Sequence, residues 1–220
     1  MSEKPILFNT EMVQAILDGR KTVTRRVIHL KYSNTHIEWK NDKYGKRLIE
    51  LQNDVEGETH GRNPDGSTWR KLLAYRELKA PYTKGDILYV RETWAKIPGA
   101  SSEGGYAYKY KASDEGEYWS RVNGFKWKPS IHMPKEAARI WLKVTGVRVE
   151  RLQDMKTVDF QKEGMQANSI PDWWNIIEQK FRKLWDSTVP KQDLDSYGWK
   201  ANPWVWVIEF ERIDYRKEQG

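Results

Sequence analysis

The chain carries its most reactive combination of side chains in residues 19–26, Gly-Arg-Lys-Thr-Val-Thr-Arg-Arg. Threonine hydroxyls and lysine amines serve as nucleophiles and bases in acyl-transfer chemistry, and guanidiniums bind carbonyl oxygens and anions. These groups in one short stretch predict a site for an anion or an amide. The alternative is a solvated surface run of cations.

Rigid elements are expected on both sides of Gly19. In residues 10–18 apolar side chains recur four positions apart, which predicts an amphipathic helix that Gly19 can end. The β-branched run 22–24 then favours a strand. Side chains alternate along a strand, so Lys21 and Thr24 lie on opposite faces unless the turn or a bulge rotates the lysine.

The composition limits the possible chemistry. The 220 residues have a formal charge of +7, with twelve tryptophans, eleven tyrosines and no cysteine. The absence of cysteine excludes disulfides, thiolate nucleophiles and cysteine-ligated zinc. The charge favours anionic partners such as RNA or nucleotides, and aromatic rings can stack on bases. Core packing is the simpler use of any single tryptophan.

The sequence shows neither a secretory leader nor a long apolar segment, so we expect a cytoplasmic protein with no membrane contact. The four histidines, at positions 29, 36, 60 and 132, lack the paired spacing of a metal site. We therefore expect neither a metal nor a cofactor. His132 is a candidate base or substrate ligand, although a lone histidine in a loop is more often structural.

The order of patterns predicts one α+β domain over residues 1–220, with insertions at about 28–80 and 98–129. Alternating pieces at 37–40 and 48–51 are typical of a hairpin, which a loop would follow. The second insertion is interpreted as another hairpin, with a turn at its Asn-Gly pair.

Three apolar patterns predict the main strands of the domain. We expect a buried strand at 87–90, a long strand at 140–149 that bends or bulges at Gly146, and a strand at 204–210 that is central or packs on both sides. The side chains that follow the first of these strands would either line a pocket or form a structural ion pair with a packed indole; they are Arg91, Glu92 and Trp94.

Two helices are expected between the second and third of these strands. Thr157 can cap a short helix that Gly164 ends. Residues 169–172 carry the cap and first-turn signals of a longer helix, whose apolar side chains keep helical spacing over 173–185.

Taken in order, these motifs resemble the ASCH domain family, in the extended form carried by bacteriophages and prophages. The resemblance rests on Gly19-x-Lys21-x-x-Thr24-x-Arg26 after a helix, the Gly85-Asp86 turn into an apolar strand, the long bent strand and the closing strand. It covers residues 5–27, 81–95, 128–186 and 198–213. It implies a PUA-like mixed β-barrel with flanking helices, and the two insertions lie outside it.

Because position 24 is a threonine, the motif is similar to that of the bacterial members that remove the acetyl group from N4-acetylcytidine. Their Lys-Thr-Glu catalytic set, carried over by motif, implies Lys21, Thr24 and Glu163 here, and Thr22 and Arg26 also match. The resemblance therefore implies an amidohydrolase that acts on N4-acylated cytosine or cytidine without a metal or cofactor.

Amide cleavage needs a nucleophile, a proton acceptor, a proton donor and stabilisation of the oxyanion. Thr24 is the candidate nucleophile and Arg26 the candidate for holding the oxyanion. Burial and the neighbouring arginines would lower the pKa of Lys21 and make it a base, whereas a nearby Glu163 would raise that pKa. Glu163 would orient Lys21 or protonate the leaving nitrogen. Further candidates for substrate contact are Thr22, Arg91, Glu92, Trp94 and His132.

The competing hypothesis is an RNA-binding PUA-like module, with or without ribonuclease activity, which the net charge and the aromatic residues favour. A third hypothesis is a phage-encoded modulator that binds a host protein or a modified base.

Overall fold

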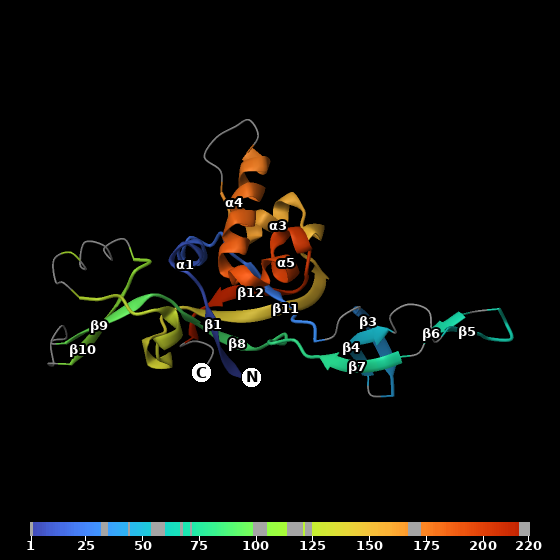
Figure 1. Ribbon diagram of the computed structural model, residues 1–220. Helices are drawn as coiled ribbons and strands as arrows, with labels where there is room; N and C mark the ends of the chain where they lie inside the picture. Colours follow the sequence, from blue (N-terminus) through green and yellow to red (C-terminus); the bar gives the residue numbers. More distant parts are fainter. Residues whose placement is uncertain are drawn as a thin grey trace. The chain divides into compact units, whose positions relative to one another are not determined.

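The computed structural model describes residues 2–31, 35–43, 45–53, 60–66, 68–70, 72–98, 105–113, 121, 125–166 and 173–215 (Figure 1). The chain has a mixed α+β fold and forms two compact units. The larger unit joins Met1–Val27 to Tyr82–Gly220, and the smaller unit is Ile28–Pro81.

A five-stranded sheet organises the larger unit. Its order is β1 (Glu3–Leu7), β8 (Ile87–Arg91), β11 (Trp141–Arg151), β12 (Trp204–Ile213) and β2 (Val23–Val27). The β1–β8 pair is parallel and the other pairs are antiparallel. Among the described residues no ladder joins β1 to β2, so the sheet is open. The mixed α+β class is confirmed, but the sheet of the expected β-barrel is not closed, because its two edge strands do not pair.

The two long strands agree with their sequence patterns. The register between β11 and β12 shifts between Val144 and Gly146, which confirms the predicted bend or bulge there. A Cβ atom on Gly146 would lie 2.9 Å from a carboxylate oxygen of Glu209, so glycine allows the close approach there. Strand β12 lies between β11 and β2 with both faces largely buried, which confirms its predicted central position.

Three helices correspond to helices that the sequence predicts. Helix α1 (Thr10–Leu17) begins with the Asn9 side chain accepting a hydrogen bond from the Met12 N–H at 2.8 Å. Helix α3 (Thr157–Lys162) has its N-cap at Lys156 rather than at the predicted Thr157, because Asp159 accepts from the Lys156 N–H at 2.9 Å. Helix α4 (Trp173–Thr188) matches the predicted long helix, whereas its predicted cap at 169–172 lies outside the described residues.

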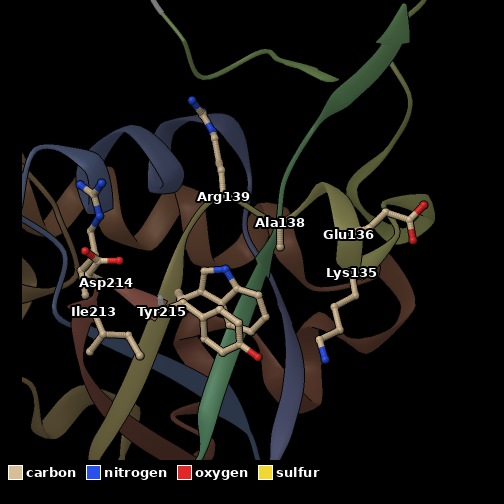
Figure 2. A pocket seen from close by; sticks show the side chains of 9 residues that line it. Lys135, Glu136, Ala138, Arg139, Ile213, Asp214 and Tyr215 are labelled. Atoms are coloured by element: carbon tan, nitrogen blue, oxygen red, sulfur yellow. The ribbon is translucent and has the colours of Figure 1, made fainter. Parts of the chain in front are cut away.

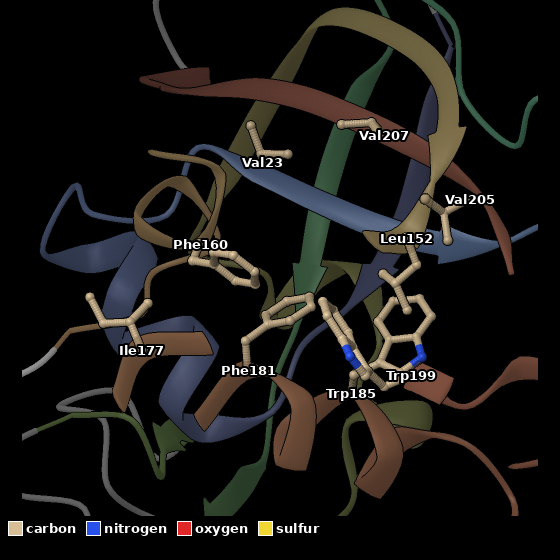
Figure 3. Packing of buried hydrophobic residues seen from close by; sticks show 9 residues of the cluster. All are labelled: Val23, Leu152, Phe160, Ile177, Phe181, Trp185, Trp199, Val205 and Val207. Carbon is tan, nitrogen blue, oxygen red and sulfur yellow. The ribbon is translucent and has the colours of Figure 1, made fainter. Parts of the chain in front are cut away.

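The main core lies between these helices and the sheet. Valines of β2 and β12 face aromatic rings of α3, α4 and the 3-10 helix η5 (Trp199–Ala201), as Figure 3 shows. The rings of Phe160 and Phe181 meet edge to face at 5.3 Å between centroids. Each such side chain contributes about 2 kcal/mol by burial. Two tryptophans of this cluster, Trp185 and Trp199, therefore belong to the hydrophobic core.

The 3-10 helix η4 (Lys191–Asp193) and the short helix α5 (Leu194–Tyr197) connect α4 to η5.

An antiparallel hairpin of β9 (Trp94–Pro98) and β10 (Tyr106–Tyr110) follows β8 in the chain. Its first strand begins before the predicted insertion at 98–129, and the predicted Asn123-Gly124 turn lies outside the described residues. Two 3-10 helices, η1 (Ser130–His132) and η2 (Lys135–Ala137), pack near it, and a third, η3 (Leu152–Asp154), follows β11.

The smaller unit contains a three-stranded antiparallel sheet of β3 (Thr35–Asp42), β4 (Gly45–Asn53) and β7 (Leu72–Leu78). The β3–β4 hairpin confirms the predicted one. The expected loop after it instead contains a second hairpin, β5 (His60–Arg62) and β6 (Thr68–Arg70), because a turn ending at Gly66 lets the flanking residues pair. No described helix of either unit is long and apolar enough to cross a membrane.

Candidate active site

The turn after α1 places Lys21 opposite the end of α3. Gly19 adopts a positive φ of 72°, and the N–H groups of Arg20 and Lys21 both donate to the Ala15 carbonyl, at 2.9 and 3.0 Å. Lys21 precedes β2 and forms an isolated antiparallel bridge with Glu163. Its direction is therefore set by the turn and by this bridge rather than by the alternation of a regular strand.

The Lys21 ammonium uses each of its three donors on protein oxygens. Its Nζ atom lies 2.5 Å from Glu163 Oε2, 3.1 Å from the Glu163 carbonyl and 2.9 Å from the Val23 carbonyl. The Lys21 side chain is fully buried and that of Glu163 is 2% exposed. The structure thus joins two predicted catalytic residues that lie far apart in sequence.

Burial has the largest effect on Lys21 and lowers its pKa. The Glu163 carboxylate acts in the opposite direction, and the charges of Arg26 and Arg25 add to the lowering. The net direction is downward, so the desolvation of the amine outweighs its ion pair. A lysine in this state gives up its proton more readily than one on the surface.

Arg25 completes the buried charge cluster. Its Nη1 donates to Glu163 Oε1 at 3.0 Å, and its Nε and Nη2 donate to Glu150 Oε1 at 2.9 and 2.6 Å. Glu163 is therefore held between Lys21 and Arg25, one on each carboxylate oxygen. Sequence reasoning missed Arg25 and Glu150 as partners. Each of them is a charged residue within a strand, and this pattern does not show which residue it will pair with.

Thr24 lies on β2 and lines a small cavity together with Glu163, Arg25 and Arg26. The residue is 1% exposed, and the cavity volume is about 30 Å³, which is room for a single water molecule. Glu163 thus contacts Lys21 and also faces the cavity of Thr24. The remaining walls are apolar except for one hydroxyl; they are Met12, Phe181, Leu184, Trp185 and Thr188.

The motif residues Arg26 and Thr22 differ in their exposure and in their contacts. Arg26 is half-buried, lines the same cavity, donates to the Leu7 carbonyl at 2.8 Å and lies over the Phe8 ring at 5.5 Å. The Thr22 side chain is exposed, and its backbone connects α3 to β12: its N–H donates to the Lys162 carbonyl and its carbonyl accepts from the Phe210 N–H, both at 2.9 Å.

Four further candidates lie away from this cavity, around the β8–β9 junction and η1. Arg91 donates to the Ile131 carbonyl, and Glu92 is buried with both carboxylate oxygens 2.9 Å from the Arg139 guanidinium. Trp94 packs in a small core with Met133 and Ala137, and His132 is exposed. Among the residues that the structure describes, the lining of the Thr24 cavity includes none of these four.

A second cavity of about 1030 Å³ lies where β11 begins and β12 ends (Figure 2). The Tyr215 ring stacks on Trp141 with 3.7 Å between centroids and 9° between planes. The Tyr215 hydroxyl and Lys135 both bind the Glu3 carboxylate. The stack already occupies one face of Trp141, and no nucleophile and base meet among the described residues that line this cavity.

Within the described ranges no group of three or more His, Asp or Glu side chains could hold a metal ion. Comparisons of the chain with protein-family models, with curated proteins and with solved structures gave no match. The functional argument therefore rests on the geometry around Lys21, Thr24 and Glu163.

Proposed function

We propose that this protein is a cytoplasmic, metal-independent amidohydrolase of the ASCH type, with a PUA-like core, that removes the acyl group from N4-acylated cytosine or cytidine. The observation that carries the proposal is the buried contact of 2.5 Å between Lys21 Nζ and Glu163 Oε2 beside the cavity that Thr24 lines. An amine, a carboxylate and a hydroxyl in this arrangement supply the base, acid and nucleophile of acyl transfer.

The proton steps balance within this set of residues. Lys21 passes a proton to Glu163, and the neutral amine then accepts the proton of the Thr24 hydroxyl as its oxygen attacks the acyl carbon. Protonated Glu163 gives its proton to the exocyclic nitrogen as the C–N bond breaks. Cytidine leaves, and the ion pair is restored. Water then hydrolyses the Thr24 ester, which releases the carboxylic acid and regenerates the hydroxyl.

Arg26 and the size of the cavity set the conditions for this chemistry. Arg26 is one of the lining residues, and its guanidinium is the candidate donor to the oxyanion. The cavity is too small for a pyrimidine, so productive binding requires Met12 and Leu184 to move aside. The unbranched methionine side chain is suited to such a change.

The test is the release of cytidine from N4-acetylcytidine by the purified protein, followed by chromatography. Lys21→Met keeps the length of the side chain, and Thr24→Val keeps its shape; each is expected to reduce kcat by at least about 100-fold. Thr24→Ser retains a hydroxyl and is expected to keep more activity than Thr24→Val. Melting curves verify that each variant is folded.

Lys162→Met and Thr157→Val are the matched controls, because both side chains are exposed on α3 and line neither the Thr24 cavity nor its approach among the described residues. Their activity is expected to equal that of the wild type. A folded Lys21→Met variant with wild-type kcat, or a wild-type protein that releases no cytidine, would exclude the proposed enzyme.

A second candidate function is RNA binding through the PUA-like core, favoured by the charge of +7. It predicts an affinity for single-stranded RNA that falls steeply between about 50 and 200 mM salt. Tight, salt-dependent binding without deacylation would favour this function over the enzyme, and no binding at low salt would remove it.

A further inference from the structure

A larger groove of about 810 Å³ adjoins the Thr24 cavity. Met12, Glu163 and Leu184 line both spaces and form their common wall. A molecule that approaches Thr24 from this side therefore places the part that does not react in the groove. The volume falls in the range of sites for nucleotide-sized ligands.

Cations from two elements face this groove. Lys180 and Lys183 lie three positions apart on α4, and Leu184 and Ser187 of the same helix face also line it. Arg20 lines it from the turn after α1. The groove thus has an apolar inner wall next to the Thr24 cavity and cationic side chains farther out.

The position of Arg20 is fixed by hydrogen bonds. Its Nη1 donates to the Gly164 carbonyl at 2.6 Å, and its Nη2 and Nε donate to Asp18 at 2.7 and 3.2 Å. Each Nη atom of a guanidinium carries a second N–H, so Arg20 can still donate to a ligand. Lys180 is held against the Gln166 carbonyl at 3.1 Å and keeps two further donors.

The charge balance of the lining favours an anion. Its acidic members are Glu11 and Glu163. Glu163 is already neutralised by Lys21 and Arg25, so its charge does not repel a ligand in the groove. Arg20 is likewise paired with Asp18, so the charges of Lys180 and Lys183 outweigh that of Glu11. Ammonium and guanidinium groups are the usual partners of phosphate oxygens.

We infer that this groove binds a phosphate of the substrate, so that the preferred substrate is an N4-acylcytidine 5′-monophosphate rather than the uncharged nucleoside. This inference rests on the proposed function, because it assigns the base and acyl group to the Thr24 side and the phosphate to the lysines. It makes the groove the determinant of substrate class and leaves the chemistry to the inner residues.

The test compares kcat/KM for N4-acetylcytidine and for its 5′-monophosphate in the wild type and in the double variant Lys180→Ala/Lys183→Ala. The wild type is expected to prefer the monophosphate by about tenfold or more through KM, and added salt is expected to reduce this preference. The double variant is expected to lose the preference, because its kcat/KM for the monophosphate falls towards that for the nucleoside.

The control is Lys191→Ala/Lys200→Ala, which removes the same charge from exposed side chains that line neither space in the described chain. It is expected to retain the preference. An equal preference in the wild type and in the groove variant, or an equal loss in the control, would overturn the inference.

Two further experiments distinguish this inference from binding of an RNA phosphate and from failure of the proposed enzyme. A short RNA containing N4-acetylcytidine tests the origin of the phosphate; a larger preference for that RNA, lost in the groove variant, would overturn the mononucleotide form. Titration of tryptophan fluorescence with cytidine and with cytidine 5′-monophosphate tests binding without chemistry. If no substrate is hydrolysed, selective binding of the monophosphate that needs Lys180 and Lys183 still supports the groove while the enzyme fails, and equal binding overturns both.

Discussion

Arg25 shows at the scale of one residue how the site tolerates buried charge. Its guanidinium is fully buried and binds the carboxylates of Glu150 and Glu163. A buried ion pair adds little stability when complete, but removing one partner leaves an uncompensated charge in the interior. The cluster is therefore a place where one substitution has a large effect on the free energy of unfolding.

Arg25→Met is expected to lower the free energy of unfolding by about 3–5 kcal/mol, because Glu150 and Glu163 lose a buried partner. Arg148→Met is the control, since Arg148 also binds Glu150 but is 41% exposed, and its loss is expected to cost about 1 kcal/mol or less. Urea denaturation measures both. Similar losses in the two variants would mean that Arg25 contributes no more than a surface ion pair.

The Asp86 carboxylate makes a contribution to stability that depends on pH. Burial alone would raise the pKa of Asp86, but hydrogen bonds from Lys4, the Thr83 N–H and the Ser2 hydroxyl lower it to about 2. An unfolded aspartate has a pKa near 3.9, so the folded state binds the proton more weakly. The stabilisation is present above that value and is lost as the pH falls towards 2.

Asp86→Asn is accordingly expected to be less stable than the wild type by about 2 kcal/mol at pH 6. The difference is expected to shrink as the pH falls from about 4 to 2, because the wild-type carboxylate becomes protonated in that window. Urea denaturation at several pH values checks this. A difference that stays constant over the whole range would show that Asp86 acts through shape rather than charge.

At the scale of elements, Gly164 sets how closely α3, α1 and the Lys21 turn approach one another. Its φ is 93°, and a Cβ atom there would lie 2.7 Å from the Ala15 Cβ and 3.2 Å from the Lys21 Cβ. Gly19 also has a positive φ, but a Cβ atom there would contact nothing within 4 Å. The two glycines therefore separate backbone strain from close packing.

Gly164→Ala is expected to destabilise the protein by about 2 kcal/mol or more and to lower the deacylation rate, because the new methyl group pushes Lys21 away from Glu163. Gly19→Ala is expected to cost about 1 kcal/mol through backbone strain alone, with the rate retained. Thermal denaturation and kcat measure the two effects. Equal rates in both variants would remove the role assigned to the approach at Gly164.

Local patterns predicted the elements that carry their own signals. The helix before Gly19, the bend at Gly146 and the central strand at 204–210 follow from periodicity and from single glycines, and the structure contains all three. The N-cap of α3 was misplaced by one residue because Asp159, rather than Thr157, supplies the capping oxygen.

The features that depend on distant partners could not be predicted from these patterns. The parallel pairing of β1 with β8 and the contact of Arg25 with Glu150 join segments that no local signal connects. Lys21 illustrates the same limit, since it precedes β2 and its bridge to Glu163, rather than strand alternation, decides its direction. Closure of the sheet likewise depends on whether the edge strands β1 and β2 pair with each other, and they do not.

At the scale of the whole molecule, the site residues and the main core belong to one of the two units. Lys21, Thr24 and Glu163 all lie in the unit that joins Met1–Val27 to Tyr82–Gly220. The smaller unit has its own sheet and an ion pair of 2.7 Å between the buried Glu50 and the partly exposed Arg76. Within the described part of the chain, the lining of the Thr24 cavity includes no residue of Ile28–Pro81.

Replacing 28–81 with a flexible Gly/Ser linker of about 15 residues is expected to leave a folded protein that retains the wild-type kcat for N4-acetylcytidine. Calorimetry and the deacylation assay measure this. Failure of the shortened chain to unfold cooperatively, or loss of activity in a folded one, would show that the smaller unit contributes to the larger.

Among the described strands, β2 pairs with β12 alone, and the register places Thr24 opposite Ile208. During synthesis, Thr24 therefore emerges from the ribosome long before β12, the strand with which β2 pairs. Such distant pairing gives a high contact order, which slows folding. Until β12 arrives, the growing chain keeps the hydroxyl and its neighbouring cations on an unpaired segment, so the enzyme proposed here would gain its activity at a late step of its own synthesis.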